Sequence, residues 1–295
     1  MTHVATLISA SGGLNISVVN RASQILQVSG AVQWLGPDAV DIPFTPAGEP
    51  DKAGLADRLR GLASDIDVVV QLAANRRKKL FLADMDSTMI MQECIDELAD
   101  YAGLKTKVGT ITERAMRGEI EFEPALRERV ALLEGLPITI IDQVLQDRIK
   151  LSPGAKTLVA TMRANGTYTC MVSGGFTAFT DRIAAAIGFE ESRANTLTIV
   201  DGHKLAGSVV EPIFGRNGKR TALIELRDKL RLGKDDTLAI GDGANDIDMV
   251  LEAGLGVAYH AKKRLAALAP ARIDHCHLTA LLYMQGYQRA EFVEA

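Results

Sequence analysis

The chain has 295 residues, enough for one large domain or two of ordinary size, and its 47% apolar and 24% charged residues are ordinary for a globular protein. A formal net charge of −4 argues against a broadly basic surface, so we expect no nucleic-acid partner. No apolar run approaches the ~20 residues that a membrane span requires, so we expect no membrane partner either.

Cysteine usage indicates a reducing compartment. The three cysteines, Cys94, Cys170 and Cys276, are odd in number and form no C-x-x-C pair, which does not suit a disulfide framework. His275 and His277 flank Cys276 at a spacing unlike that of zinc ligands, so we interpret them as surface or capping residues near the last strand. No basic stretch precedes the first apolar run, so we expect no signal peptide and a soluble, cytoplasmic protein.

The first 75 residues predict a small α+β unit, because apolar runs, helix-like stretches and breaks alternate over short distances. In chain order these are the apolar runs Val4–Ser9 and Ile16–Val19, the helical pattern Arg21–Val28, the run Val32–Leu35, a segment broken by prolines 37, 43, 46 and 50, the helix Leu55–Ser64 and the strand Asp67–Leu72. The basic run that follows, Asn75–Lys79, suits a solvated linker or a strand lead-in better than a basic patch.

From Lys79 onward the pattern predicts an α/β fold. Residues 90–150 look helical, since apolar residues recur at helical spacing and no strand signal interrupts them. Elsewhere strands alternate with helices, which predicts a doubly wound parallel sheet with ligands at the carboxyl ends of its strands. The expected strands are Lys79–Ala83, Tyr168–Val172, Thr237–Ile240 and Gly256–Ala258, the expected helices are Ala155–Ala164, Phe176–Ile187, Thr221–Leu230 and Asp246–Ala253, and a hairpin turns at Asp201-Gly202.

The segment Asp84–Thr88 has the pattern D-x-D-x-T and places two carboxylates, Asp84 and Asp86, at the tip of a buried strand. Buried carboxylates are costly unless something neutralises them, and Mg²⁺ prefers such oxygen ligands. A strand-end aspartate can also act as a nucleophile that forms an acyl phosphate. Taken alone, the short motif is explained as well by a turn in which an aspartate caps a helix.

Two further polar segments follow apolar strands. In Ser173–Gly175, backbone N–H groups and the serine hydroxyl could hold a phosphate oxygen, although S-G-G is also a common turn. In Gly241–Asp246, Asp242 is placed to complete a magnesium site, and Asp246 to orient it or to contribute through water. For Asp246 taken singly, a helix cap remains an alternative.

An aspartate that faces a phosphate accumulates negative charge, which a point cation must offset. We choose Lys219 over Arg220 and Lys204, because it lies just before an expected helix and between the second and third polar segments. The motifs D-x-D-x-T, S-G-G, K and G-D-G-x-N-D therefore follow one another in order. Their combination is far more specific than any one of them.

With these motifs, residues 79–285 resemble the haloacid dehalogenase superfamily and, within it, the phosphoserine phosphatases. The resemblance implies a Rossmann-like core in which Asp84 is the nucleophile and Asp86 is the general acid and then the general base. It also implies that the Asp84 carboxylate, the Asp86 backbone carbonyl and Asp242 hold Mg²⁺, supported by Asp246. The implied ligands of the phosphoryl group are Ser173, Gly174, Lys219 and Asn245.

Asp86 separates ester hydrolysis from other reactions of the superfamily. The dehalogenases lack this second aspartate because no leaving alcohol needs a proton, and phosphonatases carry a small residue there. The resemblance therefore implies hydrolysis of a phosphate monoester. The specific reaction that the resemblance implies is hydrolysis of O-phosphoserine to serine and phosphate through an aspartyl-phosphate, the last step of serine biosynthesis.

The helical insert of residues 90–150 resembles the cap of the phosphoserine phosphatases. There Glu93 would read the substrate ammonium and Arg129 its carboxylate, while Met116 and Phe122 would close over the site. An amino acid needs one anion and one fork-shaped cation for recognition, which supports this pair. From the residues alone, Glu93 could be solvated surface, and Arg129 could be an ordinary ion-pair partner of Glu93 or Glu128.

The expected organisation has three parts. Residues 1–75 resemble the ACT-like extension of some bacterial phosphoserine phosphatases, residues 79–89 and 151–290 form the phosphatase core, and residues 90–150 form the cap. Regulation by an amino acid through the first part and formation of a homodimer are further hypotheses. Two other functions remain open, namely a phosphatase of the same superfamily with another small monoester, such as a sugar phosphate or phosphohomoserine, and a non-catalytic ACT-type amino-acid sensor.

Overall fold

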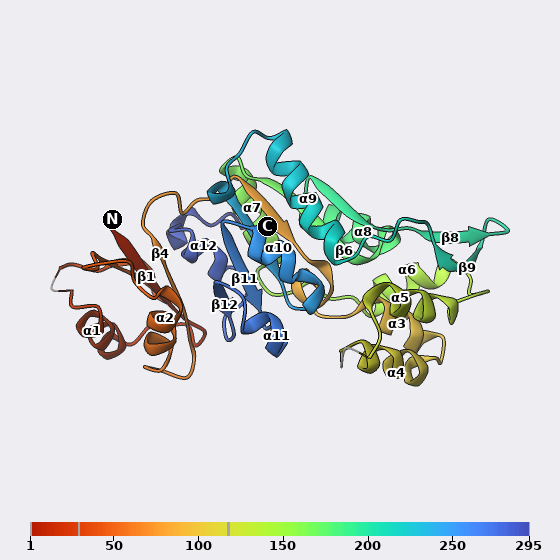
Figure 1. The fold of residues 1–295 in the computed structure, drawn as a ribbon, viewed down its shortest axis with the longest axis horizontal. Coiled ribbons are helices and arrows are strands. Elements are labelled where there is room, and N and C mark those ends of the chain that lie inside the picture. Colours follow the sequence, from red (N-terminus) through yellow and green to blue (C-terminus); the bar gives the residue numbers. More distant parts are fainter. Residues whose placement is uncertain (1, 29, 117–118, 295) are drawn as a thin grey trace.

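The computed structural model describes residues 2–28, 30–116 and 119–294. An antiparallel sheet with two helices and a group of cap helices lie at opposite ends of a central parallel sheet (Figure 1). Among the described residues, no helix combines the length and the apolar character needed to cross a bilayer.

The N-terminal unit is a four-stranded antiparallel sheet with the order β2-β3-β1-β4. Its elements are β1 (His3–Ser9), α1 (Ile16–Ile25), β2 (Gln33–Gly36), β3 (Ala39–Phe44), α2 (Lys52–Arg60) and β4 (Ile66–Leu72). Both helices pack on the same apolar cluster of the sheet. The β-α-β-β-α-β succession is that of ferredoxin-like units. The predicted α+β unit is confirmed, whereas amino-acid binding by this unit stays a prediction.

Two details of this unit differ from the prediction. Helix α1 begins at Ile16, five residues early, because the Asn15 side chain caps its first turn by accepting the Ser17 N–H at 2.9 Å. Strand β3 contains Pro43, within the segment that prolines were expected to break. Pro43 pairs with β1 and lies past the end of the register with β2, so its missing N–H costs no bond on the β2 side.

Six parallel strands form the central sheet in the order β12-β11-β10-β5-β6-β7. They are β5 (Leu80–Ala83), β6 (Tyr168–Phe176), β7 (Glu191–Asn195), β10 (Thr237–Gly241), β11 (Leu255–Tyr259) and β12 (Ala271–Ile273). The four predicted strands of the core are confirmed. The edge strands β7 and β12 were not predicted, because neither shows an extended apolar run.

Helices cover both faces of this sheet. Alternate residues of β5 face opposite sides: Phe81 and Ala83 belong to the cluster with α7 and α8, whereas Leu80 and Leu82 belong to the cluster with α9 and α10. All four are fully buried, which explains the unbroken apolar run. The doubly wound arrangement is therefore confirmed. The remaining elements of the core are α7 (Ala155–Ala164), α8 (Thr177–Ile187), α9 (Arg216–Lys229), α10 (Ile247–Glu252), α11 (Lys263–Ala266), α12 (Ala280–Met284) and the 3₁₀ turns Lys234–Asp236, Ala244–Asp246 and Arg289–Glu291.

A helical insert follows β5, as predicted. It consists of α3 (Cys94–Tyr101), α4 (Lys105–Met116), α5 (Phe122–Ala131) and α6 (Thr139–Asp147). An isolated β-bridge between Ile90 and Leu151 joins the two chain segments where the insert leaves the core and returns to it.

A hairpin from the second half of the chain, β8 (Leu197–Val200) and β9 (Lys204–Val209), lies against this insert (Figure 1). It turns at Asp201 and Gly202, both in the left-handed region, as predicted. Its backbone bonds to the segment between α5 and α6: the Gly135 N–H donates to the Leu205 carbonyl, and the Leu205 N–H to the Leu136 carbonyl, both at 2.9 Å. The cap is therefore built from two separate stretches of sequence.

The N-terminal sheet docks on the core partly through buried polar groups. Asp67 of β4 is fully buried and accepts the backbone N–H groups of three consecutive residues after β12. These are Asp274, His275 and Cys276, at 2.8, 3.2 and 2.8 Å. One carboxylate thus satisfies the turn that ends the central sheet.

The basic run Asn75–Lys79 leads into β5, as predicted, and Asn75, Arg77 and Lys79 are exposed. Arg76, however, forms an ion pair with Asp41 of the N-terminal sheet, and Lys78 is buried, donating to the carbonyls of Asn75 and Asp235. The interpretation as a solvated linker is therefore wrong for these two cations, which bond to the N-terminal unit and to the core.

Candidate active site

The three polar segments meet at the carboxyl edge of the central sheet. Strand β5 ends just before Asp84, β10 ends just before Asp242, and β6 carries Ser173. Strands β10 and β6 are the two neighbours of β5, so their ends lie together. This edge is where open α/β sheets bind their ligands.

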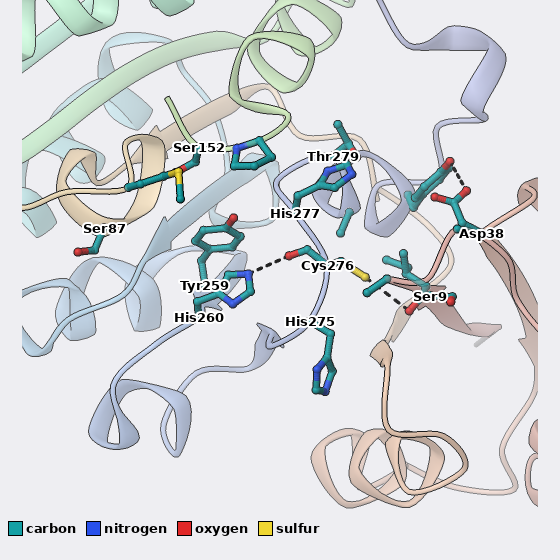
Figure 2. Close-up of a pocket in the computed structure, with 17 residues that line it drawn as sticks. Ser9, Asp38, Ser87, Ser152, Tyr259, His260, His275, Cys276, His277 and Thr279 are labelled. Atoms are coloured by element: carbon teal, nitrogen blue, oxygen red, sulfur yellow. Dashed lines mark hydrogen bonds between the residues drawn. The ribbon is translucent and has the colours of Figure 1, made fainter. Parts of the chain in front are cut away.

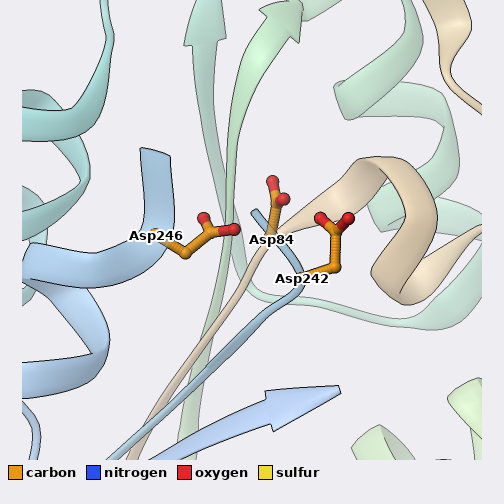
Figure 3. A group of neighbouring side chains, drawn as sticks. All are labelled: Asp84, Asp242 and Asp246. Atoms are coloured by element: carbon orange, nitrogen blue, oxygen red, sulfur yellow. The ribbon is translucent and has the colours of Figure 1, made fainter. Parts of the chain in front are cut away.

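Lys219 is fully buried and joins two of the aspartates. Its Nζ donates to Asp84 Oδ1 at 2.5 Å and to Asp246 Oδ1 at 2.7 Å. Lys219 lies in the first turn of α9 and not ahead of the helix, because α9 begins at Arg216. Figure 3 shows the carboxylates of Asp84, Asp242 and Asp246 side by side, and one oxygen of each lies within 4.8 Å of the others.

Negative charge is in excess in this cluster. Burial, and after it the nearness of Asp246, raises the pKa of Asp84 well above its ordinary value and also raises the pKa of Asp242. Burial alone would lower the pKa of Lys219, but Asp246 and Asp84 raise it above its ordinary value, so Lys219 stays cationic. One buried lysine therefore faces three carboxylates, and a further cation would stabilise their ionised forms.

The donor set fits a hard divalent metal ion, which prefers carboxylate oxygens. Both oxygens of Asp246 are already engaged, Oδ1 by Lys219 and Oδ2 by the Gly243 N–H at 3.0 Å. Among the described residues, one oxygen of Asp84 and one of Asp242 accept no hydrogen bond and form no ion pair. Asp84 and Asp242 can thus ligate a metal, while Asp246 is better placed to orient the cluster.

Asp86 is held at both oxygens. Its Oδ1 accepts the Cys94 N–H at 2.8 Å, and its Oδ2 accepts the Ser173 hydroxyl at 3.1 Å. The Ser173 hydroxyl in turn accepts the Gly175 N–H at 2.8 Å. Burial raises the pKa of Asp86, which favours the protonated form that a general acid needs.

The segment Ser173–Gly175 is a bulge within β6 and not a separate loop after it. Val172 pairs with Arg193 and Phe176 pairs with Asn195, so three residues of β6 face one residue of β7. Bulges of this kind redirect side chains next to active sites. Here the bulge turns the Ser173 hydroxyl towards Asp86.

Gly174 lies where the core and the cap approach each other. A Cβ at this position would come within 2.8 Å of the Phe122 ring of α5, and it would lie 3.8 Å from the Asn245 side-chain amide. The Asn195 side chain donates to the carbonyls of Gly174 and Phe214, at 2.9 and 3.0 Å, and so ties the bulge to the lead-in of α9. The structure therefore brings Phe122 and Asn245 together with Gly174.

Glu93 connects the first polar segment to the cap. The Ser87 hydroxyl donates to Glu93 Oε1 at 2.7 Å, and Ser87 adopts a left-handed backbone with φ of 54°, which is uncommon for serine. Burial, and after it Asp86, raises the pKa of Glu93 to about 7. Glu93 is therefore not fully solvated surface, because it is only partly exposed and its pKa is influenced by Asp86.

Arg129 of α5 forms no ion pair in the part of the chain that the structure describes. Its Nε donates to the Ala125 carbonyl at 3.3 Å and one terminal nitrogen to Thr112 Oγ1 at 3.4 Å. Glu128 pairs with Arg114 instead, at 3.1 Å, so the ordinary ion-pair interpretation of Arg129 is wrong. Burial lowers the pKa of Arg129, while the charges of Asp96, Glu93 and Asp86 favour its cationic form.

Met116, predicted to close over the site, is the last residue of α4, but its side chain lies outside the described part of the chain.

Two charged residues of this region were missed in the sequence. Lys262 follows β11, its Nζ lies 3.3 Å from Asp242 Oδ2, and its N–H donates to the Asp242 carbonyl. Asp96 lies in the first turn of α3, three residues after the N-cap Glu93, and Arg129 is the cation that most favours its charged form. The available signals were the position of Lys262 just beyond a strand end and the helical spacing of Asp96 from Glu93.

A separate cleft of about 490 Å³ lies between the N-terminal unit and the core (Figure 2). Ser9 lines it on one side, histidines 260, 275 and 277 on the other, and Ser87 at the end towards the active site. The aspartates of Figure 3 are not among the described residues that line it. His275 and His277 are exposed near the last strand, as predicted.

Known proteins share both the motifs and the fold. Residues 78–254 match the haloacid dehalogenase-like hydrolase family. The chain is 41% identical over 247 residues to a phosphoserine phosphatase of Streptomyces coelicolor; the match covers 84% of this chain but only 60% of that protein's length. It is 46% identical over 209 residues to a phosphoserine phosphatase of a Polaromonas species, covering 69% of this chain and 88% of that protein.

The likeness in structure extends over almost the whole chain. The crystal structure of a haloacid dehalogenase family hydrolase from Salmonella enterica serovar Typhi superposes with a TM-score of 0.85 and 27% identity, covering 96% of this chain and 98% of that one. The family match spans more than half of the chain and includes Asp84, Ser173, Lys219 and Asp242. The chain belongs to the haloacid dehalogenase-like hydrolases.

Proposed function

We propose that the protein hydrolyses O-phosphoserine to serine and phosphate through a phosphoaspartate on Asp84. The observation that carries this proposal is the pair formed by Glu93 and Arg129, a partly buried carboxylate and a partly buried guanidinium whose pKa values are both influenced by the charge of Asp86. An amino acid presents the complementary ammonium and carboxylate. The relatives from Streptomyces and Polaromonas named above, both phosphoserine phosphatases, support this substrate.

In the first step, a carboxylate oxygen of Asp84 attacks phosphorus, and the bond between phosphorus and the serine oxygen breaks. Asp84 Oδ1 accepts bonds from Lys219 and from the Met85 N–H, which fixes the direction of the carboxylate. Among the described residues, nothing donates to Oδ2. Such positioning prepares an in-line approach of the nucleophile.

Asp86 moves the protons. Its proton passes to the departing serine oxygen, and the resulting carboxylate then takes a proton from the water that attacks the phosphoaspartate. That attack releases phosphate and restores Asp84. The bond from the Cys94 N–H to Asp86 keeps the carboxyl group aimed at one place for both transfers. General acid–base assistance of this kind typically contributes ~10²–10⁴-fold.

The phosphoryl oxygens would be held by core residues, with Lys219 as the buried cation. The proposed contacts are Ser173, Gly174, Lys219 and Asn245. Asp84, the Asp86 backbone carbonyl and Asp242 would hold the metal, which we propose is Mg²⁺, and Asp246 would orient them. When bound, the metal adds positive charge opposite the phosphoryl oxygens.

The cap residues would determine which ester is the preferred substrate. Glu93 would accept the substrate ammonium, Arg129 would grip its carboxylate, and Phe122 with Met116 would close over the bound substrate. Three free, buried cysteines fit a reducing cytoplasm, the predicted setting for the last step of serine synthesis.

Phosphate release from phosphoserine, phosphothreonine, a sugar phosphate and an aryl phosphate, with and without Mg²⁺, tests the proposal. We expect phosphoserine to have the highest kcat/KM and turnover to need the metal. A preference for the sugar phosphate would instead support another phosphatase of the superfamily, and absence of all turnover with Mg²⁺ would support the amino-acid sensor.

A further inference from the structure

Asp96 has an unusual environment in the cap. It lies in the first turn of α3, three residues after Glu93, which precedes the helix as its N-cap. Its Oδ1 is buried and has no hydrogen-bond partner among the described residues. Buried carboxylate oxygens normally accept bonds, so an oxygen without a donor indicates that a partner arrives in another state of the molecule.

Arg129 is the cation with the largest effect on the charge of Asp96. Burial raises the pKa of Asp96, and Arg129 is the largest influence that opposes this rise. In return, Asp96 is the first of the three carboxylates that favour the charged form of Arg129. The two charges nevertheless lie beyond the 4.0 Å of an ion pair, since neither has one among the described residues.

The guanidinium of Arg129 is loosely held in this state. Its two hydrogen bonds, to the Ala125 carbonyl and to Thr112, are long, at 3.3 and 3.4 Å. The second terminal nitrogen donates to no described residue. A guanidinium has two edges, so one edge can grip a substrate carboxylate while another donates to a protein carboxylate.

We propose that Asp96 is a positioning residue for Arg129: its free oxygen accepts the guanidinium when substrate binds, and this holds the other edge of Arg129 towards the substrate carboxylate. The inference rests on the proposed function, because it needs a substrate that carries a carboxylate. Glu93 is left to bind the ammonium. The bound geometry of Arg129 is thereby fixed from within the cap, by an oxygen that is already buried and free to accept a bond.

The test compares Asp96→Asn with Glu97→Gln, a neighbouring charge removal on the same helix whose carboxylate pairs with Arg148 at 3.3 Å. Four esters are used: phosphoserine, phosphoglycolate (no ammonium), phosphoethanolamine (no carboxylate) and an aryl phosphate. We expect Asp96→Asn to raise KM about tenfold for phosphoserine and phosphoglycolate, with kcat within about twofold. The other two esters, and all four with Glu97→Gln, should change little.

Other patterns overturn the inference. Equal losses on all four esters, together with a lower melting temperature, would mean that Asp96 only supports the fold. A loss on phosphoserine and phosphoethanolamine but not on phosphoglycolate would mean that Asp96 reads the ammonium. If the unmodified protein shows no preference for phosphoserine over the aryl phosphate, the proposed function fails, and the inference fails with it.

A double mutant adds an independent readout. If Asp96 acts through Arg129, then Asp96→Asn should add nothing to the loss caused by Arg129→Ala. Additive losses in KM for phosphoserine would show that the two residues act separately and would overturn the inference even if each single variant behaved as expected.

Discussion

We call the core residues of the site, Asp84, Asp86, Lys219 and Asp246, its floor, and the part that the cap contributes, with Arg129, its wall. The charged groups of the floor are paired, whereas the cation of the wall is not. On the floor, Lys219 is bonded to Asp84 and Asp246 within 2.7 Å, and Asp86 has donors on both oxygens. On the wall, Arg129 has only long bonds and no ion pair among the described residues. Lys219 and Asp86 on the floor are hydrogen-bonded before any ester arrives, whereas the wall holds a cation that has no ion-pair partner among the described residues. In the proposed function, chemistry and choice of substrate thus fall to different segments of the chain.

The largest effect should follow from loss of the nucleophile. Asp84→Asn should lower kcat by about 10⁴–10⁶-fold, the range seen when catalytic groups of other hydrolases are removed, and by the same factor for every ester. Steady-state phosphate release on phosphoserine and an aryl phosphate measures it. The fold should persist, because the change removes one charge from a cluster with excess negative charge. Appreciable remaining activity in a well-folded variant would refute the assignment of Asp84.

Removal of the metal should also affect all esters alike. A chelator should abolish turnover, and added Mg²⁺ should restore it. Mg²⁺ at about 100 times its dissociation constant should stabilise the protein by ~2.7 kcal/mol, measured as a rise in melting temperature. In Asp242→Asn this rise should be much smaller, because one of the proposed ligands is lost. Unchanged activity in the chelator would contradict the metal site.

Substitutions of cap residues in the wall should lower activity on some esters much more than on others. Arg129→Ala should lower kcat/KM for phosphoserine about 10²-fold, since charge-assisted hydrogen bonds are worth ~1.5–3 kcal/mol each, and should leave the aryl phosphate within about threefold. Arg148→Ala is the matched control, because Arg148 is a cap cation that pairs with Glu97 and Asp100. Equal losses on both esters in Arg129→Ala would remove the basis for the distinction between floor and wall.

The smallest expected effect is a change in pH profile. Burial raises the pKa of Glu93 to about 7, and a protonated Glu93 cannot hold an ammonium by charge. The ratio of kcat/KM for phosphoserine to that for the aryl ester should therefore rise between pH 6 and 8, and Glu93→Gln should flatten it. Because the folded state holds this proton more tightly than the unfolded state, Glu93→Gln should stabilise the metal-free protein more at pH 8 than at pH 5. A ratio independent of pH would count against Glu93.

Local sequence predicted the floor better than the wall. Asp84 and Asp242 could be found because each directly follows an apolar run that makes a buried strand. Lys262 and Asp96 were missed because their roles come from packing between distant segments. The early start of α9 was missed too, since Asn217-Gly218 is a poor helix former, and tertiary contacts hold this turn: Arg216 pairs with Asp248 and Lys219 is buried.

The edges of the sheets show the same limit. Strand β7, with the sequence E-S-R-A-N, has no apolar alternation of its own, because pairing with β6 and the helix above it determine its conformation. Helix α1 did carry a readable signal in Asn15, which was overlooked as a cap. Tertiary context explains the first of these errors and incomplete use of local rules explains the second.

The carboxylate of Asp67 has a practical meaning for anyone who would shorten the protein. Residues 1–75 look like a removable module. A truncated chain that starts near β5 would nevertheless leave the N–H groups of Asp274 and Cys276 without their acceptor. It would also uncover the Tyr283 ring, whose hydroxyl now donates to Asp38. A trimmed enzyme would therefore need a redesigned surface around the last strand. Truncation alone would leave apolar surface exposed and yield a less soluble product that is prone to aggregate.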